Sequence, residues 1–246
     1  MRSRPSRVSR GSCGGGGGGS ALSLEDLIMS FDPVGYWKLD ETTGTQADDS
    51  SGNARHGTYT NATLNDQDGH ATFSAGYVEV SSHADFNLGL YGGLTCWGLF
   101  DRTSGSWYIN KAASSGSNYE WGMNVGGSFQ LQGAVFSSAG GAISTSIATG
   151  VSAPTAGWTT MGNTFSARTL VKGKQVLAVD GEISTHTETN TVSSGYVAST
   201  GVLRLGDRAD SGTGFTGAMA ECFVTQSVLS EYDFELLHAA AVAAGY

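Results

Sequence analysis

Short runs of alternating apolar and polar residues constrain this chain more than any other feature. VGYWKL at 34–39, YVEV at 77–80 and QVLAVDGE at 175–182 are three of about a dozen such runs. A period of two predicts strands, and 37 glycines against three prolines supply tight turns, as at Asp180-Gly181. The chain is therefore predicted to be all-β, a two-sheet antiparallel jelly-roll sandwich.

Residues 1–20 have the composition of a flexible arm. This segment is rich in Arg, Ser and Gly and cannot pack a core. It has charged residues but no apolar segment of a signal peptide, so neither ordinary export nor membrane insertion is expected. The candidate anchoring residues of the arm are Arg2, Arg4, Arg7, Arg10 and Cys13.

Two helices are expected to flank the strands. Ser23 stands three residues before Asp26, and apolar residues follow at helical spacing, which predicts a leader helix within 21–33 that ends at Pro33. Ser230 stands three residues before Asp233 and predicts a closing helix. The jelly-roll domain is assigned to residues 34–246.

The charge of the chain argues against a nucleic-acid partner. The formal net charge is −9, and it would be more negative without the four arginines of the arm. Phosphate binding needs basic clusters on the folded surface, which an acidic domain does not supply. Cys96 and Cys222 lie in apolar runs and are expected to be core thiols outside any disulfide.

Three stretches resemble the laminin-G-like, concanavalin A-like jelly-roll family. They are SLEDLIMSFDPVGYWKLDETTGTQADDSSGNARHGTYT, GWTTMGNTFSARTLVKGKQVLAVDGE and LRLGDRADSGTGFTGAMAECFVTQSVLSEYDFELLHAA. The chain departs from the family pattern at Ala220, where Asp is usual, and at Leu99, where Trp is common. The resemblance implies a binding module, and it extends to a leader helix of the kind seen in phage minor tail proteins.

The resemblance therefore implies a virion surface protein, in a tail or as a capsid decoration subunit, assembled in the host cytoplasm. Its partners would be other virion proteins, through the arm and leader helix, and a host cell-surface glycan. A bacterial cell-surface carbohydrate-binding or adhesion module is the alternative setting. A purely structural subunit is the alternative role, and a homo-oligomer stays open.

Catalysis is not expected. Glycoside hydrolysis needs two carboxylates facing one bond, and in glucanases of this fold they lie on one strand as Glu-x-Asp-x-x-Glu. No such run occurs; the nearest acidic pairs, Asp48-Asp49 and Asp180/Glu182, fall at turns. A glycoside hydrolase is kept only as a distant alternative.

We expect that binding requires no cofactor. A structural calcium ion is nevertheless a candidate, because the sequence offers oxygen ligands for it. Calcium takes loop carboxylate and carbonyl oxygens. The same DDSSGN loop is also a good polar turn without metal, and Ala220 removes one ligand that the family pattern would supply. The histidines lack zinc-site spacing. The candidate calcium ligands are Asp40, Asp49, Asn53 and Glu221.

Aromatic side chains beside amides and a carboxylate suggest a glycan-binding face. Flat rings stack on the apolar face of a sugar while polar groups bind its hydroxyls. Strict alternation would place Tyr119 and Trp121 on one face of their strand. The alternative is that these rings fill the core. The candidate ligand-binding residues are Trp107, Tyr108, Asn110, Tyr119, Glu120 and Trp121.

Overall fold

The computed structural model describes most of the chain from residue 22 onward. The described residues are 22–88, 93–104, 107–112, 119–125, 130–136, 142–152, 157–166, 174–187, 200–208, 212 and 214–246. The helices are α1 (Leu24–Ser30), α2 (Glu231–Ala244) and the 3-10 turns η1 (Gln67–Gly69) and η2 (Ala84–Phe86). The arm residues Arg2, Arg4, Arg7, Arg10 and Cys13 lie outside the described residues.

Fourteen strands are formed by the described residues. They are β1 (Pro33–Trp37), β2 (Gln46–Ala47), β3 (Gly57–Thr63), β4 (Ala71–Val80), β5 (Gly93–Ser104), β6 (Trp107–Ala112), β7 (Tyr119–Val125), β8 (Gln130–Phe136), β9 (Ala142–Ser152), β10 (Thr159–Ser166), β11 (Lys174–Val179), β12 (Glu182–Thr187), β13 (Val202–Leu205) and β14 (Phe215–Thr225).

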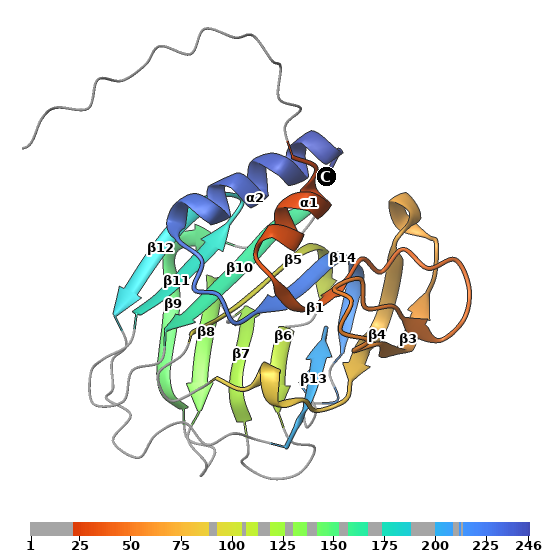
Figure 1. Cartoon of the computed structure of the whole chain (residues 1–246), viewed down its shortest axis with the longest axis horizontal. Helices are drawn as coiled ribbons and strands as arrows, with labels where there is room; N and C mark the ends of the chain where they lie inside the picture. Colours follow the sequence, from red (N-terminus) through yellow and green to blue (C-terminus); the bar gives the residue numbers. More distant parts are fainter. Residues whose placement is uncertain are drawn as a thin grey trace, which may run out of the picture.

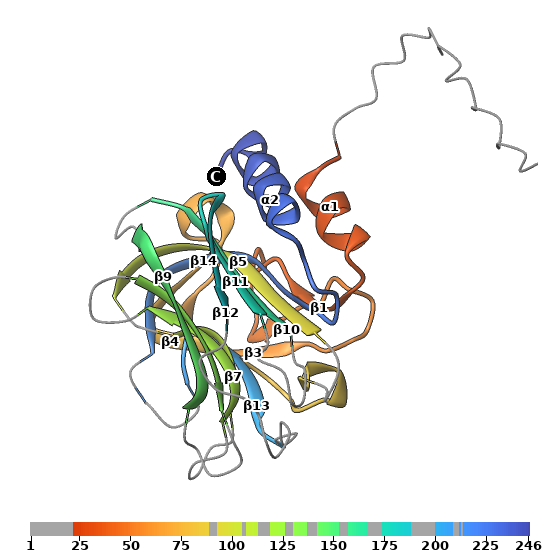
Figure 2. The same cartoon turned by 90° about the vertical axis from the view of Figure 1, so that its left-hand side faces the viewer.

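The strands form one antiparallel sheet that curls over into two facing layers. The order is β12-β11-β10-β5-β14-β4-β13-β6-β7-β8-β9, with β1 paired to β14 and β3 paired to β4. At the far end β9 lies against β11 and β12, so the two ends of the sheet approach each other (Figures 1 and 2). The predicted all-β jelly-roll sandwich, with a helix at each end of the chain, is confirmed.

Strand β5 shows how alternation divides the core into two parts. Leu94, Cys96 and Phe100 point into the space between the sheet layers. Trp97 and Leu99 point to the other side of the same strand, where they pack with the helices. Both faces of β5 are therefore buried, as its nearly continuous apolar sequence requires.

The two helices cover the outer face of the sheet and begin where the sequence predicts. The Ser23 hydroxyl accepts from the Asp26 amide, and Ser230 forms a capping box with Asp233. The leader helix is shorter than predicted because Asp32 adopts a left-handed φ of 52° and β1 begins at Pro33. Among the described residues no helix has the length and apolarity to cross a membrane.

Candidate functional site

The predicted aromatic ligand face lies mostly in the core, which corrects the expectation of an exposed surface. Of the five candidates whose side chains are described, Trp107 alone is half-buried, and the Arg208 guanidinium lies 4.8 Å from its ring centroid. The Tyr119 side chain lies outside the described residues. The other four are no more than 2% exposed: Tyr108, Asn110, Glu120 and Trp121.

A bulge in β7 accounts for the burial of two consecutive side chains, Glu120 and Trp121. In the β6–β7 register Lys111 pairs with Trp121 and Ala112 pairs with Tyr119, so Glu120 is an extra residue without an opposite partner. One extra residue breaks the period of two and turns both Glu120 and Trp121 inward. A sugar cannot stack on a ring that solvent does not reach, so these residues do not form a surface binding site.

Glu120 and Trp121 instead form hydrogen bonds with the backbone of a loop segment, residues 83–88. The Trp121 indole N–H donates to the Phe86 carbonyl at 2.8 Å, and Glu120 accepts from the Leu88 amide at 2.6 Å. The Lys111 ammonium lies 2.9 Å from the other Glu120 oxygen and donates to Asn87 at 2.6 Å. These contacts fix the position of the 83–88 segment relative to the sandwich.

This segment contributes to a surface hollow that we call the loop cleft. The cleft has a volume of about 310 Å³, and one wall is residues 53–56 and the other residues 80–83. Gly57, the first residue of β3, pairs with Val80, the last of β4, so the walls extend from neighbouring strand ends. The lining residues are Asn53, Ala54, Arg55, His56, Val80, Ser81, Ser82 and His83.

Asp49 organises the first wall. One carboxylate oxygen accepts the Tyr36 and Ser51 amides at 3.0 and 2.9 Å, and the other accepts the Arg55 amide at 2.8 Å. Burial of Asp49 opposes its ionisation, but the hydrogen bonds from Ser51 and from the three amides outweigh burial and lower the pKa of this carboxyl. A charged carboxylate therefore shapes the loop.

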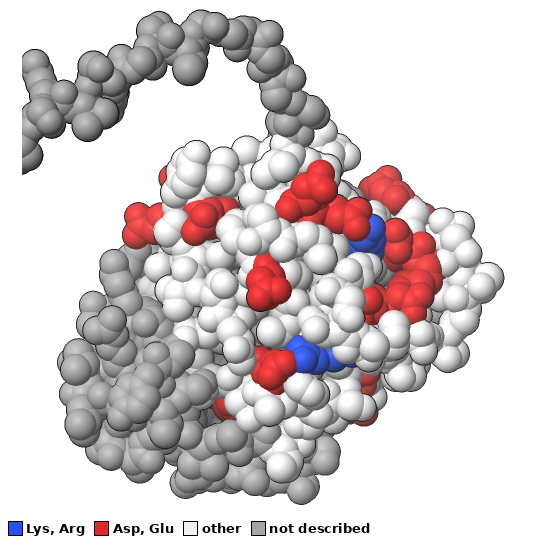
Figure 3. Space-filling view, viewed as in Figure 1, with Lys and Arg blue, Asp and Glu red and all other residues white. Residues whose placement is uncertain are grey.

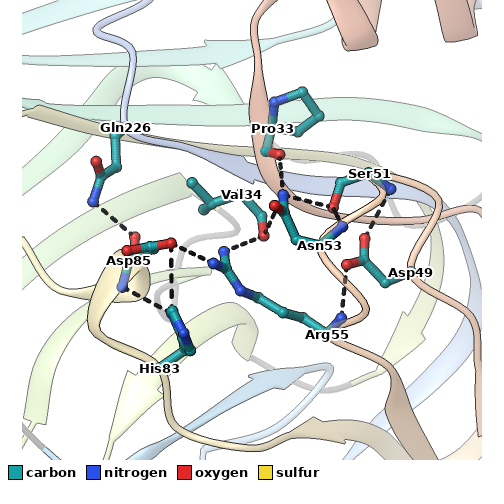
Figure 4. A network of polar contacts seen from close by, with 9 residues as sticks. All are labelled: Pro33, Val34, Asp49, Ser51, Asn53, Arg55, His83, Asp85 and Gln226. Carbon is teal, nitrogen blue, oxygen red and sulfur yellow. Dashed lines mark hydrogen bonds and ion pairs between the residues drawn. The ribbon is translucent and has the colours of Figure 1, made fainter.

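Arg55 joins the two walls (Figure 4). Its guanidinium donates to the Val34 carbonyl and forms an ion pair with Asp85, and it lies 5.4 Å from the Phe86 ring centroid. The Trp37 indole N–H donates to the Arg55 carbonyl at 3.0 Å. Since a guanidinium bonds in a fixed fork, these partners set the spacing of the walls.

Each wall carries one exposed histidine oriented in the same manner. The Asp49 amide donates to His56 Nδ1 at 3.1 Å, and the Asp85 amide donates to His83 Nδ1 at 3.2 Å. The two imidazole rings and the two serines that line the cleft supply hydrogen-bond donors and acceptors suited to hydroxyl groups.

The four candidate calcium ligands do not assemble into a metal site. Within the described part of the chain no three His, Cys, Asp or Glu side chains come together to hold a metal, so Asp40, Asp49 and Glu221 are not such a group. The Asp49 oxygens accept backbone amides, and the Asn53 amide nitrogen donates to the Pro33 carbonyl at 3.2 Å. The Asp49 oxygens are thus already used in holding the loop backbone.

Glu221 occupies a second bulge, away from the loop cleft. The β14 register shifts between Ala220 and Phe223, and Glu221 adopts a left-handed φ of 53°. Its carboxylate accepts the hydroxyls of Tyr36 and Tyr246, the latter at 3.3 Å. Burial raises the pKa of Glu221 despite these donors. The contact fastens the C-terminal residue to the sheet.

Asn53 is the one loop-cleft residue that sequence reasoning selected as a candidate, and it was selected as a calcium ligand. Ser81, Ser82 and His83 form a polar run after a strand, a pattern equally typical of an ordinary turn. The only available signal was that polar residues follow the end of one strand and precede the start of its neighbour. Recognising that signal requires the pairing of β3 with β4, which a single sequence does not state.

Comparisons with protein-family models and with curated proteins found no match. Solved structures do match. The binding domain of Paraclostridial Mosquitocidal Protein 1 has a TM-score of 0.61 at 12% identity, over 85% of this chain and 52% of that one. Botulinum neurotoxin type C, whose cell entry depends on interaction with two ganglioside molecules, matches with a TM-score of 0.61 at 10% identity, over 86% of this chain and 52% of that one.

A smaller domain matches over nearly its whole length. Domain 4 of AbnA, an extracellular GH43 arabinanase from Geobacillus stearothermophilus, was solved with arabinotriose and has a TM-score of 0.57 at 15% identity, over 84% of this chain and 98% of that one. The present chain spans about half the length of the toxin domains. At these identities the similarity shows the jelly-roll-like fold.

Proposed function

We propose that this chain is a non-enzymatic carbohydrate-binding module of the laminin-G-like type and that the loop cleft holds the sugar. The observation that carries the proposal is the cleft itself, a polar hollow whose walls are fixed by Asp49, Arg55 and Glu120. Preorganised walls reduce the entropy lost when a flexible ligand binds. The arabinotriose-bound and ganglioside-dependent neighbours support a glycan as the ligand class.

The test is a glycan array followed by titration calorimetry on the full chain. Ser82→Ala and His83→Ala remove exposed cleft groups, and Ser74→Ala is the matched control because Ser74 is an exposed serine in β4 outside the cleft. We expect each cleft variant to weaken binding about tenfold, since each lost hydrogen bond leaves a sugar hydroxyl unpaired. Ser74→Ala should keep the original affinity.

Calcium and chelator arms belong in the same titration, because the proposal requires no cofactor. Equal affinity with calcium and with chelator is expected. Binding that is abolished by chelator would contradict the cofactor-free site. Binding that survives both cleft variants unchanged would contradict the location, and failure of the folded chain to bind any glycan would favour the second candidate, a purely structural subunit.

We propose that this module acts on the surface of a virion, as a tail or capsid decoration subunit. The resemblance of the leader helix and first strand to phage minor tail proteins supports this setting. Arg2, Arg4, Arg7, Arg10 and Cys13 would anchor it to other virion proteins. Removal of residues 1–20 should leave the circular dichroism spectrum unchanged and prevent incorporation into particles. Normal incorporation of the truncated chain would contradict the anchoring role of the arm, and absence of the unmodified chain from particles would favour the alternative, a bacterial cell-surface adhesion module.

A further inference from the structure

An apolar groove runs between the two helices. Helices α1 and α2 lie side by side on the outer face of the sheet (Figures 1 and 2). The groove, which we call the helix groove, has a volume of about 290 Å³. Its lining residues are Leu22, Leu27, Leu236, Ala239, Ala240 and Ala243. The lining is wholly aliphatic, unlike that of the loop cleft.

The exposed apolar side chains of the described residues lie in or beside the two helices, and Leu22 among them lines the groove. Within the described part of the chain every large hydrophobic side chain that is exposed belongs to one of the helices or lies within three residues of one. Monomeric domains rarely concentrate exposed apolar surface, and such patches mark interaction sites. These exposed residues are Leu22, Met29, Val228, Tyr232 and Val242.

The helices around the groove are acidic. Neither α1 (LEDLIMS) nor α2 (EYDFELLHAAAVAA) contains a lysine or arginine. In Figure 3 acidic side chains lie over this layer and over neighbouring parts of the same face, where basic side chains are few. The carboxylates are Glu25, Asp26, Glu231, Asp233 and Glu235, and Glu25 also forms an ion pair with Lys38 at 2.8 Å.

The charge and the shape of the helix groove indicate which kind of molecule it binds. A second copy would bring like charges together, which opposes association. Residues 1–21 are basic but contain few apolar side chains to fill an aliphatic groove. Ala239, Ala240 and Ala243 have small side chains, which let another helix approach closely. A basic amphipathic helix meets both requirements.

We propose that the helix groove binds an amphipathic helix of a partner protein, with an apolar stripe at i, i+3, i+4 and i+7 flanked by lysine and arginine. The stripe would lie on the aliphatic lining and the cations would face the carboxylates of α1 and α2. This proposal does not rest on glycan binding at the loop cleft.

The probe is a set of three synthetic peptides of about 18 residues, roughly five helical turns. The first has a leucine stripe with lysines on the polar face, the second has the same stripe with glutamates, and the third has the composition of the first in shuffled order. Fluorescence anisotropy with the full chain should detect binding of the first peptide alone. Affinity should fall when salt is raised from about 0.1 M to about 0.5 M, because the contributing charges are exposed.

Two exposed alanines near the end of α2 provide matched variants. Ala243 lines the groove and Ala244 does not, and both side chains are exposed. Ala243→Gln should weaken binding of the basic peptide about tenfold by filling the groove, and Ala244→Gln should leave it unchanged. Equal effects of the two variants, or equal binding of the ordered and shuffled peptides, would overturn the proposal.

Two further outcomes identify other occupants and would also overturn it. Sedimentation that shows a dimer of the full chain, dissociated by Ala243→Gln, would assign the groove to a second copy. A large gain in peptide affinity after removal of residues 1–21 would assign it to the chain's own arm. Glycan titration of Ala243→Gln is expected to match the unmodified chain, which separates this test from the loop-cleft test.

Discussion

Two ion pairs hold the 83–88 segment, one from inside the sandwich and one from its edge. The Lys111–Glu120 pair is buried, with side-chain exposures of 0% and 1%. The Arg55–Asp85 pair is half open to solvent, with exposures of 12% and 42%. Both pairs hold the segment that directly follows the second wall of the loop cleft, but water reaches only one of them.

Because their exposure differs, the two ion pairs should have different roles, one in the stability of the fold and the other in the position of the cleft wall. Breaking a buried pair leaves one charge in a medium that solvates it poorly, so the whole fold is affected. An exposed pair gains little free energy because water and salt screen it. The interior pair should therefore determine whether the domain folds, and the edge pair should determine where the cleft wall lies.

Lys111→Met is the strongest test of this separation. It leaves the Glu120 carboxylate buried without its cation, and we expect a loss of about 3–5 kcal/mol in the free energy of unfolding. Urea denaturation followed by circular dichroism measures the change. The double variant Lys111→Met/Glu120→Leu should lose less than Lys111→Met alone, because no charge is then buried. A loss below about 1 kcal/mol for the single variant would contradict the interior role.

Two of the four carboxylates that sequence reasoning assigned to binding, Glu120 and Glu221, lie at bulges. Sequence periodicity predicted the strands, both helix caps and the sandwich, because those features repeat along the chain or have local signals. A bulge adds one residue without a reliable local signal, and it moves every following side chain to the other face. Trp121, assigned to a surface, lies in the core, so Trp121→Ala would report unfolding instead of sugar binding.

The loop cleft could not be predicted for a different reason. His56 and His83 are 27 residues apart in sequence and meet only because β3 and β4 are neighbours. Alternation shows that strands exist but not which strands pair. The Asp-Ser-Ser-Gly-Asn loop was recognisable as a polar turn, and Asp49 does act there as an acceptor of amides, which is the simpler of the two roles considered for it.

Asp49→Asn tests whether hydrogen bonds, more than the edge ion pair, stabilise the first wall. The new amide would direct a donor at the Tyr36 or Arg55 amide, and we expect a loss of about 1–3 kcal/mol at pH 7. The folded-state pKa of Asp49 is lowered, so its contribution is complete above the ordinary value of 3.8 and is lost as pH falls through the lower folded value.

Acid titration of unfolding free energy supplies the control for this variant. The difference between the unmodified chain and Asp49→Asn should be constant from pH 7 to about pH 5 and should shrink below about pH 4. A difference that stays constant down to pH 2 would show that the charge of Asp49 does not stabilise the loop.

Asp85→Asn should have the smallest effect on stability and a clear effect on binding. The substitution preserves size but removes the charge opposite Arg55, and exposed pairs contribute about 0.2–1 kcal/mol. The backbone of residue 85 still donates to His83 and accepts from Gln226, so the segment should stay folded. Glycan affinity should nevertheless fall, because the second wall loses its link to Arg55. If stability falls as far as in Lys111→Met, or if affinity is unchanged, then the edge pair and the interior pair do not have the separate roles that their different exposure implies.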